Sequence, residues 1–216
     1  MFEMLLIEGL AIGACYGLFG VAVAIIYKTS DVVNFAQGEM GMLATFVAYH
    51  IMTAYGWPFY IAFPATLIFA ILLGMAIEIC ILRPAKEPTV LGLLILTLGA
   101  EMLLMGLAGW KWGAEQKDFP FLLSVSDTVQ IFPGFALNSW TIGVFVLTAV
   151  IMVLLFLFFR YSKLGIAMRA TQQNENAAKI MGIKVERVFS ITWGMSSLIG
   201  ALAAIERSNV IGDKRD

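Results

Sequence analysis

Six long apolar runs are the feature of the sequence that most constrains the fold. Each is close to or above the roughly 20 residues that a helix needs to cross the hydrocarbon core of a membrane. Only 13% of the residues are charged, against about 25% in an ordinary soluble domain. The sequence therefore predicts an all-α, polytopic integral membrane protein with about six transmembrane helices. The predicted spans are Leu5–Tyr27, Val32–Met52, Phe59–Leu82, Val90–Gly109, Trp140–Phe159 and Val188–Ile205.

The basic residues predict how these spans are oriented, because short loops rich in Lys and Arg stay on the cytoplasmic side. Lys28 follows the first span and Arg83 ends the third. The segment 160–187, between the fifth and sixth spans, carries six further basic residues. We therefore expect one membrane-spanning domain over residues 1–216, with a cytoplasmic loop at 160–187 and an external loop at 110–139. The N-terminus is expected outside the cell.

Several classes of function are disfavoured by what the chain contains. A formal net charge of −1 gives no electrostatic basis for nucleic-acid binding. The single histidine and two cysteines, Cys15 and Cys80, show no metal-ligand spacing and no nucleophile–base arrangement. We therefore expect no catalytic residue, no metal, no bound cofactor and no enzymatic activity. The sequence also lacks a G-x-x-x-x-G-K-[ST] phosphate loop, so any ATP would be used by partner subunits.

Three glycines recur at four-residue spacing in the first span: Gly9, Gly13 and Gly17. Such overlapping G-x-x-x-G steps let a neighbouring helix approach closely, which matters in lipid because no hydrophobic force drives helices together. We predict a helix-packing face here. The alternative is that this face lines a substrate path.

The stretch KTSDVVNFAQGEMGM, residues 28–42, is unusually polar for the start of a span. Asn34, Gln37 and Glu39 lie close to two glycines there. One interpretation is a broken or re-entrant element, which is tolerated in a membrane only when buried in protein or facing a water-filled cavity. The other is a loop that runs on until a helix begins near Glu39. In both cases Glu39 would lie near a helix N-terminus, where a negative charge is favoured.

Two further acidic residues fall within predicted spans. Glu78 lies near the cytoplasmic end of its span, and we expect it to reach the membrane interface. Glu101 lies in mid-span, so we expect it to face the bundle interior beside a polar partner such as Thr97, one helical turn away. The candidate translocation path, chosen by polarity, consists of Asn34, Gln37, Glu39, Thr97 and Glu101.

The loop at 160–187 predicts two short helices. Ser162 can cap the first, Asn174 can cap the second, and Gly182 suits the left-handed position after a helix end. An apolar face of the second helix is formed by Ala177, Ile180 and Met181. An amphipathic helix of this kind either lies on the anionic inner membrane surface or docks into a groove of a soluble partner. Its adjacent alanines favour docking.

The same loop carries a resemblance to a known family. AAKIMG at 177–182 resembles the Glu-Ala-Ala, three residues, Gly pattern of ABC-importer permeases, with Asn176 at the glutamate position and Glu175 one residue earlier. GIAMRATQQNENAAKIMGI, VVNFAQGEMGML, LRPAKEPTVLGLLILTLG and WGAEQKDFP resemble the branched-chain amino acid permeases of the LivH type. The resemblance runs from about Gly9 to Ala204. It implies a multi-pass permease domain in the inner membrane of a bacterial cell.

The resemblance implies a coupling helix that inserts into a groove of an ATPase subunit. The residues to which it assigns this role are Arg169, Ala170, Asn174, Glu175, Asn176, Ala177, Ala178, Ile180, Met181 and Gly182. It also implies the partners: two cytoplasmic ATPases, a second (LivM-like) permease chain or a second copy of this one, an external solute-binding protein, and membrane lipid.

The resemblance leaves the transported solute open among branched-chain amino acids, other amino acids, amides and urea. Family members usually continue with further membrane helices, so we expect this chain to be a truncated or incomplete member. The alternative function is a stand-alone ion-coupled transporter or channel that uses the intramembrane acids Glu39 and Glu101. A pH or sodium gradient that drives uptake without ATP would favour that alternative.

Overall fold

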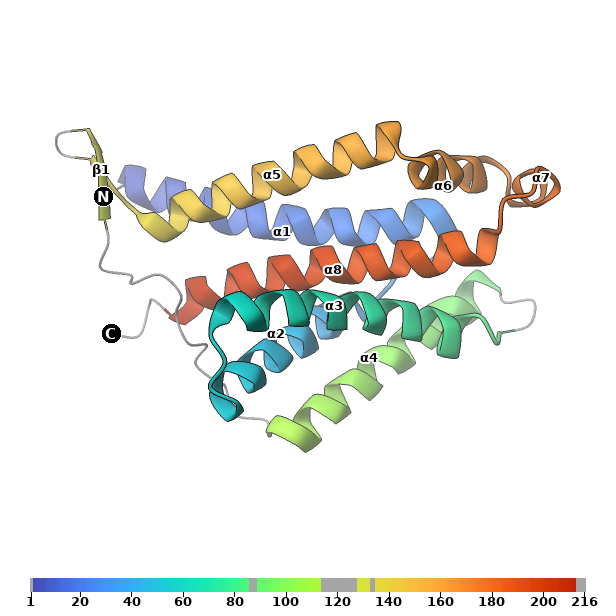
Figure 1. Ribbon diagram of the computed structural model, residues 1–216, viewed down its shortest axis with the longest axis horizontal. Helices are drawn as coiled ribbons and strands as arrows, with labels where there is room; N and C mark the ends of the chain where they lie inside the picture. Colours follow the sequence, from blue (N-terminus) through green and yellow to red (C-terminus); the bar gives the residue numbers. More distant parts are fainter. Residues whose placement is uncertain (1, 86–88, 114–127, 133–134, 213–216) are drawn as a thin grey trace.

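The computed structural model describes residues 2–85, 89–113, 128–132 and 135–212. It is a bundle of long helices lying side by side (Figure 1). The long helices are α1 (Phe2–Ser30), α2 (Gln37–Ala54), α3 (Phe59–Ile77), α4 (Val90–Trp112), α5 (Ser139–Tyr161) and α8 (Val185–Gly212). A π-helical turn, η1 (Glu78–Leu82), extends α3, and two short helices, α6 (Lys163–Gln173) and α7 (Glu175–Ile180), connect α5 to α8.

Five of these helices are long and apolar enough to cross a membrane, within the described ranges: α1, α3 with η1, α4, α5 and α8. The helical, multi-pass architecture predicted from the apolar runs is thereby confirmed, with five such helices among the described residues rather than the predicted six, because α2 is not one of them. A two-stranded antiparallel hairpin, β1 (Thr128–Phe132) and β2 (Phe135–Asn138), precedes α5, with Thr128 opposite Asn138. Much of the remaining predicted external loop lies outside the described residues.

The second predicted span differs from the expectation. It was predicted to begin at Val32, but α1 continues to Ser30 and α2 begins only at Gln37. Between them the backbone is irregular, with Asp31 in the left-handed region at φ 52°. The side chains of Val32, Asn34 and Ala36 in this irregular segment are buried. The segment is thus a buried, irregular connection, and α2 begins two residues before Glu39. It has the burial that the broken-element interpretation requires, because a polar backbone cannot face lipid, and the late helix start that the loop interpretation predicts.

Local chemistry explains where the other helices begin and end. Pro58 precedes α3 in an extended conformation, and Thr89 caps α4 by accepting a hydrogen bond from the Gly92 amide at 3.1 Å. The α3 helix loosens into η1 through a bond from the Arg83 amide to the Glu78 carbonyl at 2.8 Å. A proline follows at position 84, where the helical run ends.

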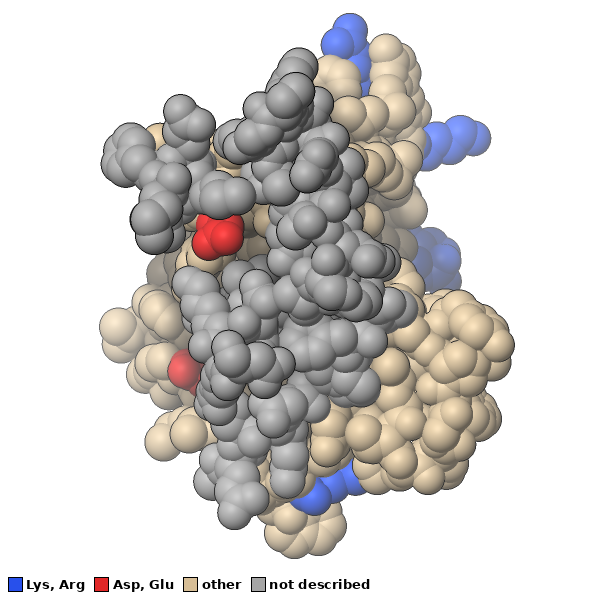
Figure 2. Space-filling view, turned by 90° about the vertical axis from the view of Figure 1, so that its left-hand side faces the viewer, with Lys and Arg blue, Asp and Glu red and all other residues tan. Residues whose placement is uncertain are grey.

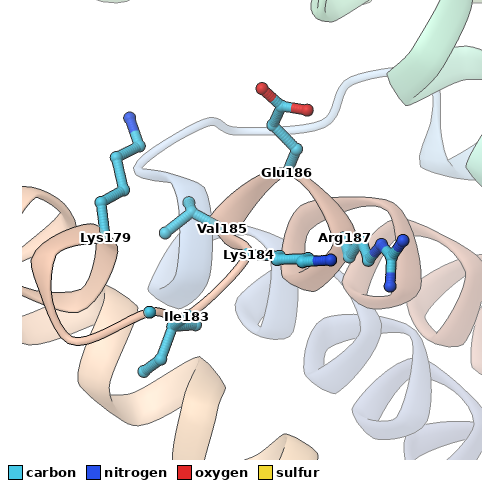
Figure 3. A pocket seen from close by; sticks show the side chains of 7 residues that line it. Lys179, Ile183, Lys184, Val185, Glu186 and Arg187 are labelled. Atoms are coloured by element: carbon cyan, nitrogen blue, oxygen red, sulfur yellow. The ribbon is translucent and has the colours of Figure 1, made fainter.

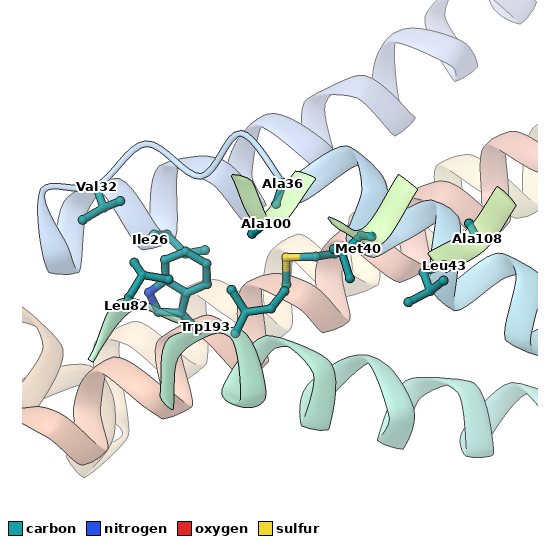
Figure 4. Close-up of a cluster of buried hydrophobic side chains, with 11 residues drawn as sticks. Ile26, Val32, Ala36, Met40, Leu43, Leu82, Ala100, Ala108 and Trp193 are labelled. Atoms are coloured by element: carbon teal, nitrogen blue, oxygen red, sulfur yellow. The ribbon is translucent and has the colours of Figure 1, made fainter. Parts of the chain in front are cut away.

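Helix α8 lies at the centre of the bundle. It packs against α1, α2 and α3, whereas α4 and α5 lie at the periphery (Figure 1). Of its membrane-crossing stretch, 72% is buried, against 11% for α5. Figure 4 shows the largest core cluster, in which Met40 of α2 and Trp193 of α8 lie beside the irregular segment that contains Val32 and Ala36. The irregular segment is therefore held between α2 and α8.

The end of α1, the turn η1 and the α6–α7 connection all lie at one end of the bundle (Figure 1). This basic end carries Lys28, Arg83 and the cations of the 160–187 segment, as alternate loops of a multi-pass protein should. The opposite end, which faces the viewer in Figure 2, shows charged groups of both signs as isolated patches among the described residues. The connections therefore alternate between two ends, as the sequence predicts.

Candidate coupling and translocation sites

The short helix α7 is fixed at both ends by local hydrogen bonds. Asn174 caps its start, its Oδ1 accepting a hydrogen bond from the Ala177 amide at 2.9 Å. At its end, the Gly182 amide donates to the Lys179 carbonyl and the Ile183 amide to the Ala178 carbonyl, both at 3.0 Å. Gly182 has φ 84°, and this pair of bonds around a left-handed glycine is a Schellman motif. The predicted cap and the predicted glycine stop are both confirmed.

The apolar side chains of α7 point away from the rest of the chain. Ile180 is 86% exposed and Met181 82% exposed, while Ala178 is buried on the opposite side. Ala177 is exposed as well. The predicted apolar face therefore exists, and Ala178 anchors the helix to the bundle rather than belonging to that face. Exposed large apolar groups on a rigid, capped helix are typical of a docking surface.

Charged groups surround α7 at its junction with α8. Glu175 forms an ion pair with Lys179 at 2.6 Å within the helix, so the acidic residue of the α7 start is turned toward its own helix. A pocket of about 520 Å³ lies at the junction and is lined by Lys179, Lys184, Glu186 and Arg187 among others (Figure 3). Ile183 and Val185 also line this pocket, so charged and apolar groups meet there.

Helix α6 occupies a different position from α7. Ser162 caps it, accepting a hydrogen bond from the Gly165 amide at 2.8 Å. Gly165 is required because a β carbon there would lie 2.7 Å from the carbonyl oxygens of Phe158 and Phe159. Arg169 lines a pocket with α1 and α5 rather than the exposed face of α7, and Ala170 is only partly exposed. Of the predicted coupling residues, these two are therefore set apart from the others.

An ion-pair network that sequence reasoning missed joins the end of α3 to the start of α8. Two nitrogens of the Arg83 guanidinium donate to the Glu78 carboxylate, Nε at 3.2 Å and Nη2 at 2.8 Å. The same Nη2 lies 2.6 Å from Ser190 Oγ, which donates to Glu78 Oε2 at 2.6 Å. Glu78 is buried, so the expectation that it reaches the interface is wrong; Arg83 neutralises it.

Near the middle of the bundle, Asn34 and Gln37 form a buried polar cluster with α8. Asn34 Nδ2 donates to Gln37 Oε1 at 3.0 Å, and Gln37 Nε2 donates to the Ser196 carbonyl at 3.0 Å. Ser196 Oγ donates to the Ala22 carbonyl of α1 at 2.7 Å. A β carbon at Gly200 would collide with the Gln37 amide. Two predicted path residues are thus engaged in holding the irregular segment against α1 and α8.

Thr97 is likewise engaged with the irregular segment. Its hydroxyl lies 3.2 Å from the Val33 carbonyl and 2.9 Å from the Leu94 carbonyl. The prediction that Thr97 is the polar partner of Glu101 is therefore wrong, since its hydrogen goes to backbone. Glu101 instead interacts through space with the like charge of Glu39 on α2. The buried Oε2 atom of Glu39 has no hydrogen-bond partner.

All five predicted path residues thus gather where the irregular segment and the start of α2 meet α4 and α8. They fall into two groups with different surroundings. Asn34, Gln37 and Thr97 are buried and hydrogen-bonded. Glu39 and Glu101 are only partly buried and form no ion pair within the described part of the chain. The structure thus engages the other three residues in hydrogen bonds and leaves the two acids without an ion-pair partner among the described residues.

The glycines of α1 have no neighbour within the described chain. Nothing lies within 4 Å of a β carbon placed at Gly9, Gly13 or Gly17. Close approach occurs elsewhere: a β carbon at Gly74 would collide with the Trp193 carbonyl, and one at Gly41 would lie 3.0 Å from the Gly200 carbonyl. A packing role for the three α1 glycines stays a prediction that a helix of another subunit would have to fulfil.

Comparison with known proteins gives the family. The model of the family described as branched-chain amino acid transport system / permease component matches residues 5–210. The chain belongs to this family. The permease is 26% identical over 208 residues to the high-affinity branched-chain amino acid transport system permease protein LivH of Escherichia coli strain K12, covering 92% of this chain and 68% of the relative.

Two other relatives show the breadth of the similarity. A probable branched-chain amino acid transport permease protein LivH of Methanocaldococcus jannaschii is 28% identical, covering 94% of the permease and 64% of the relative. The autoinducer 2 import system permease protein LsrD of Klebsiella pneumoniae is 25% identical, covering 93% and 58%. No solved structure matches the permease. Among the described residues no group of three or more metal-ligating side chains is present.

The sequence of the last predicted span contained a signal for helix contacts that we did not predict. TWGMSSLIG, residues 192–200, places two serines and two glycines inside an apolar run. Small and polar residues of this kind are typical of helix–helix contacts in membranes. Glu206 also belongs to this helix rather than to a tail, and it accepts a hydrogen bond from Cys15 Sγ of α1 at 3.6 Å. The composition of α8 thus marked it as the central helix.

Proposed function

We propose that this permease is the membrane-spanning subunit of an ABC importer and that α7 couples it to an ATPase subunit. The observation that carries the proposal is the exposed pair Ile180 and Met181 on a short, doubly capped helix at the basic end of the bundle. Such a helix keeps its shape while it moves as a unit. Partner ATPases would use the ATP, and an external solute-binding protein and a second permease chain or copy would complete the importer.

The contacts of α7 suggest how motion would travel into the bundle. When the ATPases close on ATP, α7 would move with the groove that holds it, because that groove contacts it differently in the two ATPase states. A short connection joins α7 to α8, the buried central helix. Arg83 ties the first turns of α8 to η1 and α3 through Glu78 and Ser190. A displacement of α7 would therefore shift α8 and α3 together.

The solute we propose is a branched-chain amino acid or a related small polar solute. The LivH relatives support the amino acid, and LsrD shows that similar chains serve import systems for other small molecules. Glu39 and Glu101, next to the irregular segment, are the groups that would meet the polar part of the solute. Asn34, Gln37 and Thr97 would hold that segment in place.

The coupling proposal is tested by affinity purification from mild detergent. Tagged permease from its native cells should bring along an ATPase subunit that contains a phosphate loop. Ala177→Glu places a charge on the exposed face of α7 and should abolish that recovery while membrane insertion is unchanged. Gln173→Glu, an equally exposed change on α6, is the matched control and should retain the ATPase. Recovery of the ATPase with Ala177→Glu would exclude α7 as the docking element.

A second candidate function rests on the interaction between Glu39 and Glu101. Glu39, whose Oε2 has no hydrogen-bond partner, lies on α2 within electrostatic range of Glu101 on α4. Acidic residues inside a membrane protein often mark an ion or proton pathway. The permease relatives favour ATP-driven transport. Uptake into vesicles that contain no ATP distinguishes the two: transport driven by an imposed pH or sodium gradient, and lost in Glu101→Gln, would establish the ion-coupled function.

A further inference from the structure

A second pocket lies at the basic end of the bundle, between α1, α5 and α6. Its volume is about 410 Å³, within the range of about 300–1,000 Å³ typical of small-molecule sites. The residues that line it are Val21, Ala24, Ile25, Lys28, Thr29, Phe159, Met168, Arg169 and Gln172. None of the proposed path residues and no residue of α7 is among them, and Arg169 is the one predicted coupling residue that lines it. The pocket is therefore separate from the proposed path and from α7.

The polar residues of this pocket carry two positive charges. Lys28 lies in the last turn of α1, and Arg169 lies on α6. The ion pairs within the described part of the chain are Arg83–Glu78 and Lys179–Glu175, so no carboxylate neutralises either cation. Among the described residues, the Arg169 guanidinium donates one hydrogen bond, to the Arg160 carbonyl at 3.5 Å. The pocket therefore presents two unpaired cations to whatever enters it.

The other wall of the pocket is apolar and belongs to the membrane-crossing part of the chain. Val21, Ala24 and Ile25 lie within the apolar stretch of α1, and Phe159 lies within that of α5. Cations at the end of a span and apolar side chains immediately below them are arranged as a phospholipid is, with phosphate at the surface and acyl chain beneath. An acidic segment of a soluble protein would leave this apolar wall without an apolar partner.

The pocket beside α7 provides a contrast. It too is basic, but it is lined by the α7–α8 connection rather than by membrane-crossing faces of two helices. Its Lys179 is already paired with Glu175. Its apolar lining is limited to Ile183 and Val185, beside the α7–α8 connection, and does not form a wall from two membrane-crossing helices. The combination of unpaired cations and such a wall distinguishes the pocket between α1, α5 and α6.

We propose that the pocket between α1, α5 and α6 binds one anionic phospholipid, with its phosphate between Lys28 and Arg169 and the upper part of an acyl chain against Val21, Ala24 and Phe159. The lipid would hold α6 against α1 and α5 at the membrane surface. Because lipid binding needs no ATPase, its test is independent of the proposed coupling function.

The test measures which lipids stay bound to the purified full-length permease. Native mass spectrometry follows retention of phosphatidylglycerol and of phosphatidylcholine after gentle delipidation. The wild type should retain phosphatidylglycerol preferentially. Lys28→Gln with Arg169→Gln should lower its retention about fivefold for each charge removed. Lys163→Gln with Arg187→Gln, which removes two charges from the same end of the bundle but outside the pocket, is the matched control and should retain the lipid.

A second variant tests the apolar wall without changing charge. Ala24→Trp should fill the pocket and lower retention of phosphatidylglycerol, whereas Ala149→Trp, on an exposed part of α5, should leave it unchanged. Equal retention of the two lipids by the wild type, or equal losses in both double variants, would overturn the proposal. So would displacement of phosphatidylglycerol by millimolar inorganic phosphate, since that would identify a site for free anions.

Discussion

Individual glycines decide how closely the helices of this permease approach one another. Gly74 of α3 lies where a β carbon would collide with the Trp193 carbonyl of α8. Because the obstacle is backbone, no side-chain rotation can relieve it. At Gly194 the surrounding side chains leave somewhat more room, with the nearest atom at 3.1 Å. Contact between α3 and α8 thus depends on the absence of a single carbon at Gly74.

Gly74→Ala should therefore destabilise the bundle, by about 1–3 kcal/mol as for other overpacked cores. Thermal unfolding of the purified chain in detergent, followed by intrinsic fluorescence, measures the change. Gly99→Ala on α4 is the control, because nothing lies within 4 Å of its β carbon, and its melting temperature should be unchanged or higher. Equal melting temperatures for both variants would contradict the close contact between α3 and α8.

Substituting the two members of the Glu78–Arg83 ion pair should lower the stability of the bundle by unequal amounts. The Glu78 side chain is 6% exposed and that of Arg83 36% exposed. Arg83→Gln leaves a buried carboxylate without its cation, which should cost about 3 kcal/mol. Glu78→Gln leaves a guanidinium that can still reach water, and should cost about 1 kcal/mol.

Denaturation of the two variants in detergent measures this difference. Uptake assays should also show weaker coupling in Arg83→Gln, because α8 would then be less firmly tied to α3. A result in which Glu78→Gln is the more damaging change would show that the buried carboxylate is stable without Arg83.

At the scale of elements, the sequence predicted the helices that depend on local chemistry. Apolar length predicted six spans, of which five are long and apolar enough to cross a membrane within the described residues. Ser162, Asn174 and Gly182 predicted the limits of α6 and α7, because caps and left-handed glycines act within one helical turn. The start of α2 could not be predicted in the same way. The residues from Asp31 to Ala36 are held in irregular form by Thr97 and by Gln37 with Ser196, partners distant in the sequence.

The same limit applied to the candidate sites. The polarity of Asn34, Gln37 and Thr97 correctly indicated that they avoid lipid, but polarity could not distinguish a structural hydrogen bond from a solute contact. Likewise, the spacing of Gly9, Gly13 and Gly17 indicated a packing face without indicating which helix would meet it. In each case the missing information was the identity of a partner on another element.

The exposed glycines of α1 lead to a prediction about assembly. If a second permease chain packs there, Gly13→Leu should block its approach and yield a smaller complex on native gels. Gly106→Leu, at a similarly open glycine of α4, is the control for adding a large side chain to an exposed helix. An unchanged complex in Gly13→Leu would assign the glycine face to lipid.

For the whole molecule, the alternation of connections between two ends predicts a specific pattern of chemical labelling. With Cys15→Ala and Cys80→Ala as background, Gln173→Cys should be protected in intact cells from a membrane-impermeant maleimide. Tyr55→Cys, in the exposed connection between α2 and α3 at the other end, should be labelled. The proposed orientation places the N-terminus outside. The reverse labelling pattern would show the opposite orientation and would leave the fold unchanged.

The central position of α8 also affects the order in which the bundle can assemble. It is the last of the described helices to leave the ribosome, yet α1, α2 and α3 all pack against it. Until α8 inserts, its contacts with earlier helices are missing. They involve Gly41, Gly74 and the side-chain amide of Gln37, which binds Ser196. The core of the bundle is thus completed last, and the segment synthesised just before α8 is the basic α6–α7 connection. The proposed coupling helix would therefore be made before the core that it is proposed to move has closed.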